Sequence, residues 1–249
     1  MKKLLFFILI ATSVLHSYSQ FYIGPKIGLN MSSASVMPST EGSFSAKLKE
    51  VSDFVPKLAL NFGAVTSVKL FKGLYLQTEF VYNGKGLKAK IDRTINDTSL
   101  TGNWNYTFHY FEIPLMFKYV MGSGGFGPYI EAGVHWGYFI DASYEIEMQY
   151  GNEKYESSYK IDTEYDSDDD NTRANRNEFG FRVGIGLEFQ ANNSNKVFVS
   201  LRYAQGLTDV VEYKNKPDNY QKNYNRIFQL SIAYQFEIST SSEDKIYYY

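Results

Sequence analysis

The sequence predicts an all-β fold: an eight-stranded antiparallel up-and-down transmembrane β-barrel with long external loops and short periplasmic turns. Eight segments of about ten residues alternate between apolar and polar side chains, as strands with two different faces do. The connections between these segments run long, short, long, short, long, short, long. The 249-residue chain is 17% aromatic, yet its mean hydropathy is −0.33. A barrel with aromatic girdles and a polar interior combines these two properties.

The start of the chain has the pattern of a signal peptide. Two lysines precede an apolar run at residues 4–15, which is too short to span a membrane comfortably. Ser17 and Ser19 then provide the small residues of a cleavage site, so that Gln20 becomes the mature N-terminus. An uncleaved anchor helix is the alternative. We therefore expect an exported protein with a signal peptide at residues 1–19, an outer-membrane β-barrel domain at 20–236 and a polar tail at 237–249.

The first three strands are expected at residues 23–30, 57–70 and 74–84. Each has apolar side chains at every second position, and the proline of the first strand suits a position near a strand end. The residues expected on their apolar faces are Ile23, Pro25, Ile27, Leu29, Leu58, Leu60, Phe62, Ala64, Val68, Leu70, Leu76, Phe80 and Tyr82. Residues 71–73 form a tight turn, whereas 31–55 and 84–105 are long polar connections, the second strand-like where it leaves the barrel.

The fourth and fifth strands are expected at residues 106–119 and 127–140, joined by a glycine-rich turn at 121–126. In the fourth strand, Phe111 and Leu115 alternate with Glu112 and Lys118. The longest connection follows at residues 141–177. It is expected to hold an extended hairpin around Gly151 and Asn152, because its flanks also alternate.

The last three strands are expected at residues 178–189, 196–208 and 228–236. The first of them alternates most clearly, since every odd position is large and apolar and every even position is glycine or charged. A short turn at 191–195 and a medium loop at 209–223 connect the three. All of them are again about as long as a tilted strand must be to cross a bilayer.

The apolar faces are expected to contact lipid and the polar faces to line the lumen. The alternative is a soluble, secreted lipocalin-like barrel with its apolar faces inside. The alternation alone does not say which face points inward, because a shift of the strand register by one residue exchanges the two faces. The loop asymmetry favours the membrane orientation, and so do the glycines of the polar faces, which fit a narrow interior. These glycines are Gly133, Gly137, Gly180, Gly184 and Gly186.

Eight charged residues, four of each sign, share the predicted lumen face. They are Lys26, Glu79, Glu112, Lys118, Glu131, Arg182, Glu188 and Arg202. Unpaired charges in a poorly hydrated interior are costly, so we expect a structural network paired across the strands. In particular, Arg182 is expected between Glu131 and Arg202 of the neighbouring strands. A permeation path is the competing interpretation, although so many side chains leave little pore in eight strands.

Two other motifs share features with known ligand-binding sites. Residues 122–127 match G-x-G-x-x-G, but a strand is expected to follow where dinucleotide binding requires a helix. The acidic run contains Asp166, Asp168 and Asp170, yet an EF-hand needs Gly and Glu where Asn171 and Asn177 stand. A looser external calcium site, assisted by Asp162 and Glu164, is the alternative to a solvated loop tip.

No feature of the sequence predicts an enzyme or a resident cofactor. The chain has no cysteine, and beyond the expected signal peptide its histidines are His109 and His135, on different strands. We place His135 in the lumen near the outer rim and His109 on the outward face at that rim. No nucleophile–base–acid set accompanies them. A net charge of −2 without a basic patch also argues against nucleic-acid binding.

The strand sequences resemble the PorT-like outer-membrane β-barrel family of Gram-negative bacteria. The similar segments are residues 24–30, 76–82, 110–115, 127–133, 199–203 and 229–236. The resemblance implies an outer-membrane barrel without a catalytic motif, and the named member of the family looks like a component of a protein-secretion apparatus. Phe236 resembles the terminal-strand signal for the barrel-assembly machinery, but residues 237–249 follow it, unlike in that signal.

The function expected from the sequence is that of a non-enzymatic envelope or surface protein, structural or binding, that acts through its external loops. Its expected partners are outer-membrane lipid, the barrel-assembly machinery during biogenesis and other envelope proteins. The alternative is a transport or secretion component, either a small channel or a subunit of a larger machine.

Overall fold

The computed structural model describes residues 20–34, 52–95, 98–122, 125–161, 172–192, 194–213, 222 and 224–238. The expected signal peptide, the acidic run at 166–171 and residues 239–249 lie outside this part of the chain. Among the described residues, no helix has the length and apolarity needed to cross a membrane.

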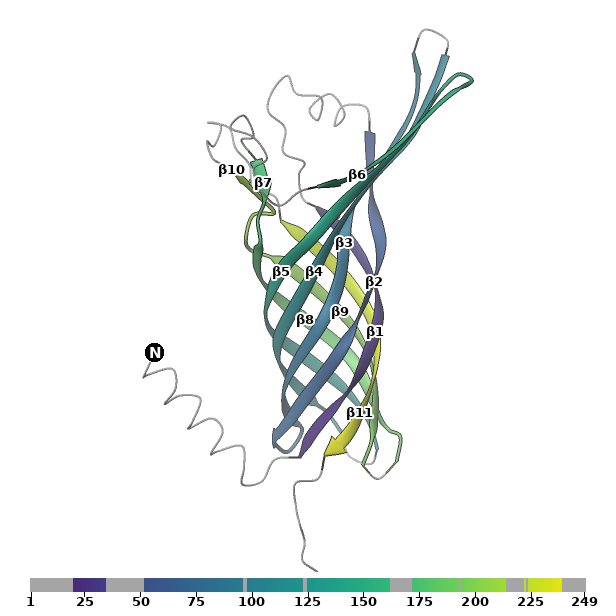
Figure 1. Cartoon of the computed structure of the whole chain (residues 1–249). Helices are drawn as coiled ribbons and strands as arrows, with labels where there is room; N and C mark the ends of the chain where they lie inside the picture. The colour runs from purple at the N-terminus through teal and green to yellow at the C-terminus, as the bar shows by residue number, and fades with distance from the viewer. Residues whose placement is uncertain are drawn as a thin grey trace, which may run out of the picture.

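Eight antiparallel strands form a closed ring (Figure 1). The sheet order β4-β3-β2-β1-β11-β9-β8-β5 is closed by pairing between β4 and β5, which confirms the predicted fold. The strands of the ring are β1 (Phe21–Ala34), β2 (Ser52–Phe71), β3 (Leu74–Ile95), β4 (Thr98–Val120), β5 (Phe126–Tyr150), β8 (Asn177–Gln190), β9 (Lys196–Gly206) and β11 (Asn225–Ile238).

Tight turns connect the strands at the end of the ring where β1 begins and β11 ends (Figure 1). The turn between β2 and β3 uses Gly73 with a φ of +78°, a conformation that glycine adopts without strain. The turn between β4 and β5 contains Gly122 and Gly125, both also with positive φ. Strand β5 begins at Phe126, within the G-x-G-x-x-G motif, where a dinucleotide site would need a helix.

The outer surface of the ring carries a belt of exposed apolar side chains. On β8, the odd-numbered residues from Phe179 to Phe189 are 39–59% exposed, whereas Arg182 is 1% exposed. The same division holds on the other strands, so that Leu58, Ile130 and Leu230 are all at least half exposed. An apolar belt of this extent is stable when it contacts lipid and is a liability in water. The alternation was therefore oriented correctly.

Three strands extend well beyond the predicted limits. β3 continues to Ile95 and β4 starts at Thr98, so the predicted polar connection at 84–105 is mostly a paired hairpin. β5 continues to Tyr150 and pairs with β6 (Glu153–Ile161), which forms the hairpin expected around Gly151. The long connections were therefore correctly located but underestimated as strands, because their outward faces are polar where no lipid contacts them.

The extended parts form one sheet that projects past the ring (Figure 1). We call it the projecting sheet; it comprises residues 52–56 of β2, 87–95 of β3, 98–107 of β4, 142–150 of β5, and β6. A separate two-stranded sheet of β7 (Thr172–Ala174) and β10 (Val211–Tyr213) lies at the same end and was not predicted.

Candidate functional site

The lumen is filled by side chains that the period-two pattern of the strands directs inward. All eight charged residues expected there are at most 8% exposed. Lys85, Glu178 and His135 join them as buried lumen residues, and the half-buried Lys196 closes the lower end of the network. We describe the charges as three groups, from the short-turn end of the ring toward the projecting sheet.

The lower triad consists of Lys118, Glu188 and Lys196. The Glu188 carboxylate lies 2.6 Å from Lys118 Nζ and 2.9 Å from Lys196 Nζ. Aromatic rings enclose the two ammonium groups: Lys118 Nζ is 4.3 Å from the ring centroid of Phe198, and Lys196 Nζ is 4.3 Å from that of Tyr75. Such cation–π contacts are worth about 2 kcal/mol or more when desolvated. They help to hold the excess positive charge of this group.

The middle tetrad consists of Lys26, Glu79, Glu131 and Arg202, and it is electrically balanced. Arg202 donates from Nε and Nη2 to the two carboxylate oxygens of Glu131, at 2.5 and 2.9 Å. Its Nη1 donates to Glu79 at 2.7 Å, and Lys26 Nζ donates to the other oxygen of Glu79 at 2.6 Å. No member is more than 3% exposed. This bidentate, charge-assisted geometry offsets the desolvation of the four ions.

The upper tetrad consists of Lys85, Glu112, Glu178 and Arg182, and it is balanced as well. Lys85 bridges the two carboxylates, since its Nζ contacts Glu112 and lies 2.8 Å from Glu178. Arg182 pairs with Glu112 of β4, which also accepts from Asn83 Nδ2 at 2.5 Å. The expected neighbours Glu131 and Arg202 bind each other instead. The prediction considered adjacent strands only, whereas lumen side chains meet across the ring.

Glycines provide the room that these side chains occupy. A Cβ atom at Gly184 would lie 2.8 Å from Arg202 Cγ and 2.9 Å from a carboxylate oxygen of Glu131. A Cβ atom at Gly186 would lie 2.3 Å from both the Tyr129 ring and a backbone oxygen of β9. Because real Cβ atoms do not approach this closely, larger residues at these positions would force the lumen apart.

One buried cluster has the residue types of a metal site. Ligand atoms of Glu112, His135 and Glu178 lie within 4.8 Å of one another. The ammonium group of Lys85 already lies between the two carboxylates, and Arg182 contacts Glu112. A cation bound there would meet two fixed positive charges. The arrangement therefore suits an ion-pair network better than a metal centre.

The two histidines lie in different environments. His135 is buried in the lumen, with Nε2 3.4 Å from Glu178. His109 stacks on Tyr82 at a centroid distance of 5.5 Å and lies 3.8 Å from Asp141 at the rim of the barrel. The calcium ligands considered at Asp166, Asp168 and Asp170, with Asp162 and Glu164, lie outside the described residues.

Sequence reasoning missed Lys85, Glu178 and Lys196 as members of the network. Lys85 continues the alternation of Gln77, Glu79 and Asn83 on β3, but it fell in a segment interpreted as a connection. Glu178 and Lys196 stand at the first even-numbered positions of β8 and β9 that have a charged side chain. Extending the period-two pattern of β3 past residue 84 would have identified Lys85, whereas Glu178 and Lys196 already stood on the polar faces of the predicted strands.

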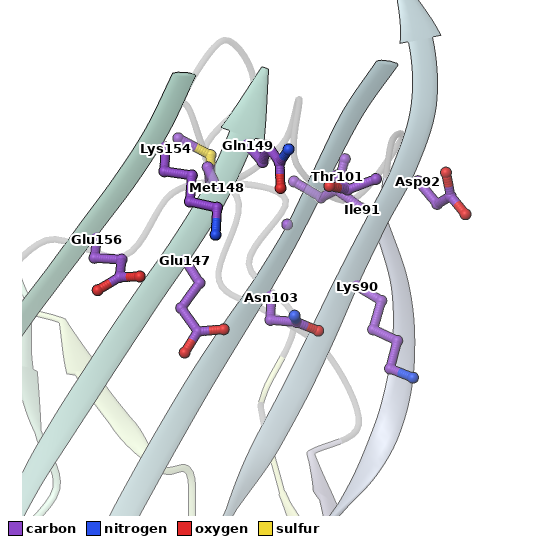
Figure 2. A pocket seen from close by; sticks show the side chains of 11 residues that line it. Lys90, Ile91, Asp92, Thr101, Asn103, Glu147, Met148, Gln149, Lys154 and Glu156 are labelled. Atoms are coloured by element: carbon purple, nitrogen blue, oxygen red, sulfur yellow. The ribbon is translucent and has the colours of Figure 1, made fainter. Parts of the chain in front are cut away.

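The projecting sheet has two unlike faces. One face packs Ala89, Ile91 and Trp104 into a buried apolar cluster, with Leu100, Tyr106, Ile146 and Met148 against it. The opposite face continues the outward surface of the barrel and is polar. In one row across four strands, Lys90 faces Asn103, Asn103 faces Glu147 and Glu147 faces Glu156 (Figure 2). A hollow of about 330 Å³ lies among these side chains.

Comparison with known proteins identifies one matching family model, described as outer membrane protein beta-barrel domain, over residues 15–212. No curated protein matches the sequence. OprG from Pseudomonas aeruginosa is similar in structure, with 12% identity, a TM-score of 0.48, and coverage of 90% of this chain and 98% of OprG. Outer membrane protein W of E. coli gives 15% identity, a TM-score of 0.43 and coverage of 90% and 100%. The Neisserial surface protein NspA gives 9% identity, a TM-score of 0.41, and coverage of 89% of this chain and 100% of NspA.

Proposed function

Because the chain belongs to the outer membrane protein beta-barrel domain family, we propose that it is a non-enzymatic surface protein of the outer membrane that binds through its projecting sheet. The observation that carries the proposal is the contrast between the lumen and the projecting sheet. The lumen charges are paired and inaccessible, whereas the polar face of the projecting sheet is exposed and charged. Groups that are free to contact a partner are therefore concentrated outside the barrel.

The filled lumen argues against a channel. A conducting pore leaves the polar atoms of its wall in contact with water, yet the charges of the middle tetrad are at most 3% exposed. In planar bilayers we expect no steady, salt-dependent openings from the purified full-length protein. Openings of that kind would contradict the closed lumen and favour the transport alternative.

The surface role requires that the projecting sheet lie outside the cell. Long connections of outer-membrane barrels are external and short turns are periplasmic. An epitope inserted between Gly151 and Asn152 is therefore expected to bind antibody on intact cells. The matched control is the same epitope after Lys72, in the short turn between β2 and β3, which should be labelled only after the cells are opened. Labelling of the control on intact cells would mean that the barrel has the opposite orientation, with its short turns outside the cell.

We propose that cleavage after Ser19 precedes insertion by the barrel-assembly machinery. The resemblance of residues 110–115 and 229–236 to PorT-like barrels supports a second candidate function, as a subunit of a secretion apparatus. That candidate predicts stable association with other envelope proteins. Purification in mild detergent, followed by mass spectrometry, would distinguish it: a stoichiometric complex favours the machine subunit, and isolated barrel favours the independent surface protein.

A further inference from the structure

A cavity at the base of the projecting sheet brings lysines together with apolar residues of the lipid-facing surface. It measures about 520 Å³ and lies on the outward side of β2 and β3. Lys57, Lys88 and Lys90 line it together with Leu58 and Asn105, and its lining contains no carboxylate. Cationic side chains and an exposed leucine in one cavity form the pattern expected for an anionic amphiphile.

The backbone directs all three lysines to this cavity. Lys88 and Lys90 stand two residues apart on β3 and therefore share its outward face. The Lys57 side chain reaches the same side by passing over Gly86, where a Cβ atom would lie 3.1 Å from Lys57 Cδ. The Nζ atom of Lys57 then donates to Thr107 Oγ1. A side chain at Gly86 would hinder this crossing, and its φ of +148° also favours glycine.

The lysines of the cavity outnumber the acids on the strands beside them, and the cavity lining itself has three lysines and no carboxylate. Neither Lys88 nor Lys90 forms an ion pair with a carboxylate whose side chain the structure describes. On the neighbouring strand β2, Asp53 stands opposite Lys90 and Val55 stands opposite Lys88. The acids on β5, Glu145 and Glu147, are each separated from the lysines by an asparagine of the intervening strand β4. Lys88, with Val55 and Asn105 opposite it on the two neighbouring strands, is thus available for an anion, and Lys57 and Lys90 add positive charge beside it.

An apolar track leads from the middle of the barrel up to the cavity. It is formed by two columns of exposed side chains on neighbouring strands, paired as Ile27 with Phe62, Leu29 with Leu60, and Met31 with Leu58. All six are 44–69% exposed, and Leu58 at the upper end lines the cavity itself. An acyl chain lying on this track would bring the headgroup of its lipid to the lysines.

We propose that this cavity binds the phosphorylated headgroup of an outer-leaflet lipid, with the acyl chains of that lipid on the track formed by β1 and β2. The lysines bind the phosphate as point charges, and Leu58 joins the polar and apolar halves of the site. The site would fix the height of the projecting sheet above the membrane. Lys90 belongs both to this site and to the polar row of Lys90, Asn103, Glu147 and Glu156, whereas the other lining residues of the cavity are not part of that row.

The proposal can be tested by native mass spectrometry of the full-length protein in detergent, titrated with diphosphoryl lipid A. The test variant is K88Q/K90Q, and the charge-matched control is K72Q/K154Q, whose lysines are exposed elsewhere. A juxtamembrane lysine contributes roughly fivefold to binding of an anionic surface, so we expect about 30-fold weaker binding for the test variant. The control should bind as the wild type does.

Two further arms identify the source of the anion. Dephosphorylated lipid A should bind at least tenfold more weakly than diphosphoryl lipid A, and Leu58→Asn should weaken lipid A binding while the barrel remains folded. Equal binding of the dephosphorylated lipid, equal losses in test and control variants, or inorganic phosphate binding as tightly as the lipid would each overturn the proposal.

Discussion

The middle tetrad provides a sharp test of the lumen network, through the substitution Arg202→Met. Methionine fills much of the space of the arginine stem but removes its donors to Glu131 and Glu79. Glu79 retains Lys26 at 2.6 Å, so the main consequence is that Glu131, which is 3% exposed, loses its hydrogen-bonded ion-pair partner and keeps only Lys118 of the neighbouring strand as a nearby cation. Removing one partner of a buried ion pair costs about 3–5 kcal/mol, and we expect a loss of that size.

The assay is urea unfolding of the refolded protein in phospholipid vesicles, from which the free energy of unfolding is extrapolated. The double variant E131Q/R202M removes the orphaned charge along with its partner, so it should recover most of the loss and lie within about 1–2 kcal/mol of wild type. Arg226→Met is the matched control, because Arg226 is exposed on the outer surface of β11, and it should change stability by about 0.5 kcal/mol or less.

Two results would refute the reasoning. If R202M were no less stable than R226M, the buried contacts of Arg202 would contribute nothing measurable. If E131Q/R202M were no more stable than R202M, the loss would come from packing instead of an unpaired carboxylate, since a coupled pair shows an interaction energy of about 0.5–3 kcal/mol in a double-mutant cycle.

Two other predictions test the crowding of the lumen and the independence of the projecting sheet. Gly184→Leu should destabilise the barrel by about 1–3 kcal/mol and so lower its thermal unfolding midpoint. Gly137→Ala should cost less, because its Cβ would lie 3.3 Å from Glu112 Cγ. Equal midpoints for the two variants would mean that these positions do not need glycine to leave space for other side chains. The second variant lacks residues 90–101, so that Gly102 and Asn103 form a two-residue turn between the paired Ala89 and Trp104. It should still run as a folded, heat-modifiable barrel on unheated gels, because the deleted residues pair only within the projecting sheet. A barrel that no longer folds would show that the sheet is part of its core.

The interior and exterior of each ring strand could be predicted because side-chain alternation is a local property. Arg182 and Glu188 differ from Phe181 and Val183 by position parity alone, and the same rule holds on all eight strands. The glycines of the polar faces were also a correct guide to crowding, since Gly184 and Gly186 leave room for Arg202 and Tyr129.

Ion-pair partners could not be predicted in the same way. Arg182 binds Glu112 and Arg202 binds Glu131, and in both pairs the two strands are not neighbours in the ring. Contacts across a lumen depend on the diameter and stagger of the closed sheet, which no single strand encodes. The extent of the projecting sheet was missed for a related reason. Its outward residues, such as Lys90 and Glu147, are as polar as a loop because they lie beyond the lipid.

The sequence by itself therefore determined the eight strands of the ring, their order around a closed sheet and the face that each residue of the predicted strands presents, because these follow from a two-residue repeat and the lengths of the connections. Only the tertiary structure decided which charges neutralise one another, how far the strands extend into the projecting sheet, and that Lys57, Lys88 and Lys90 meet above an apolar track. Those features arise when strands distant in the chain are brought to fixed heights around one ring, and the height of each strand is set by the closure of the whole sheet.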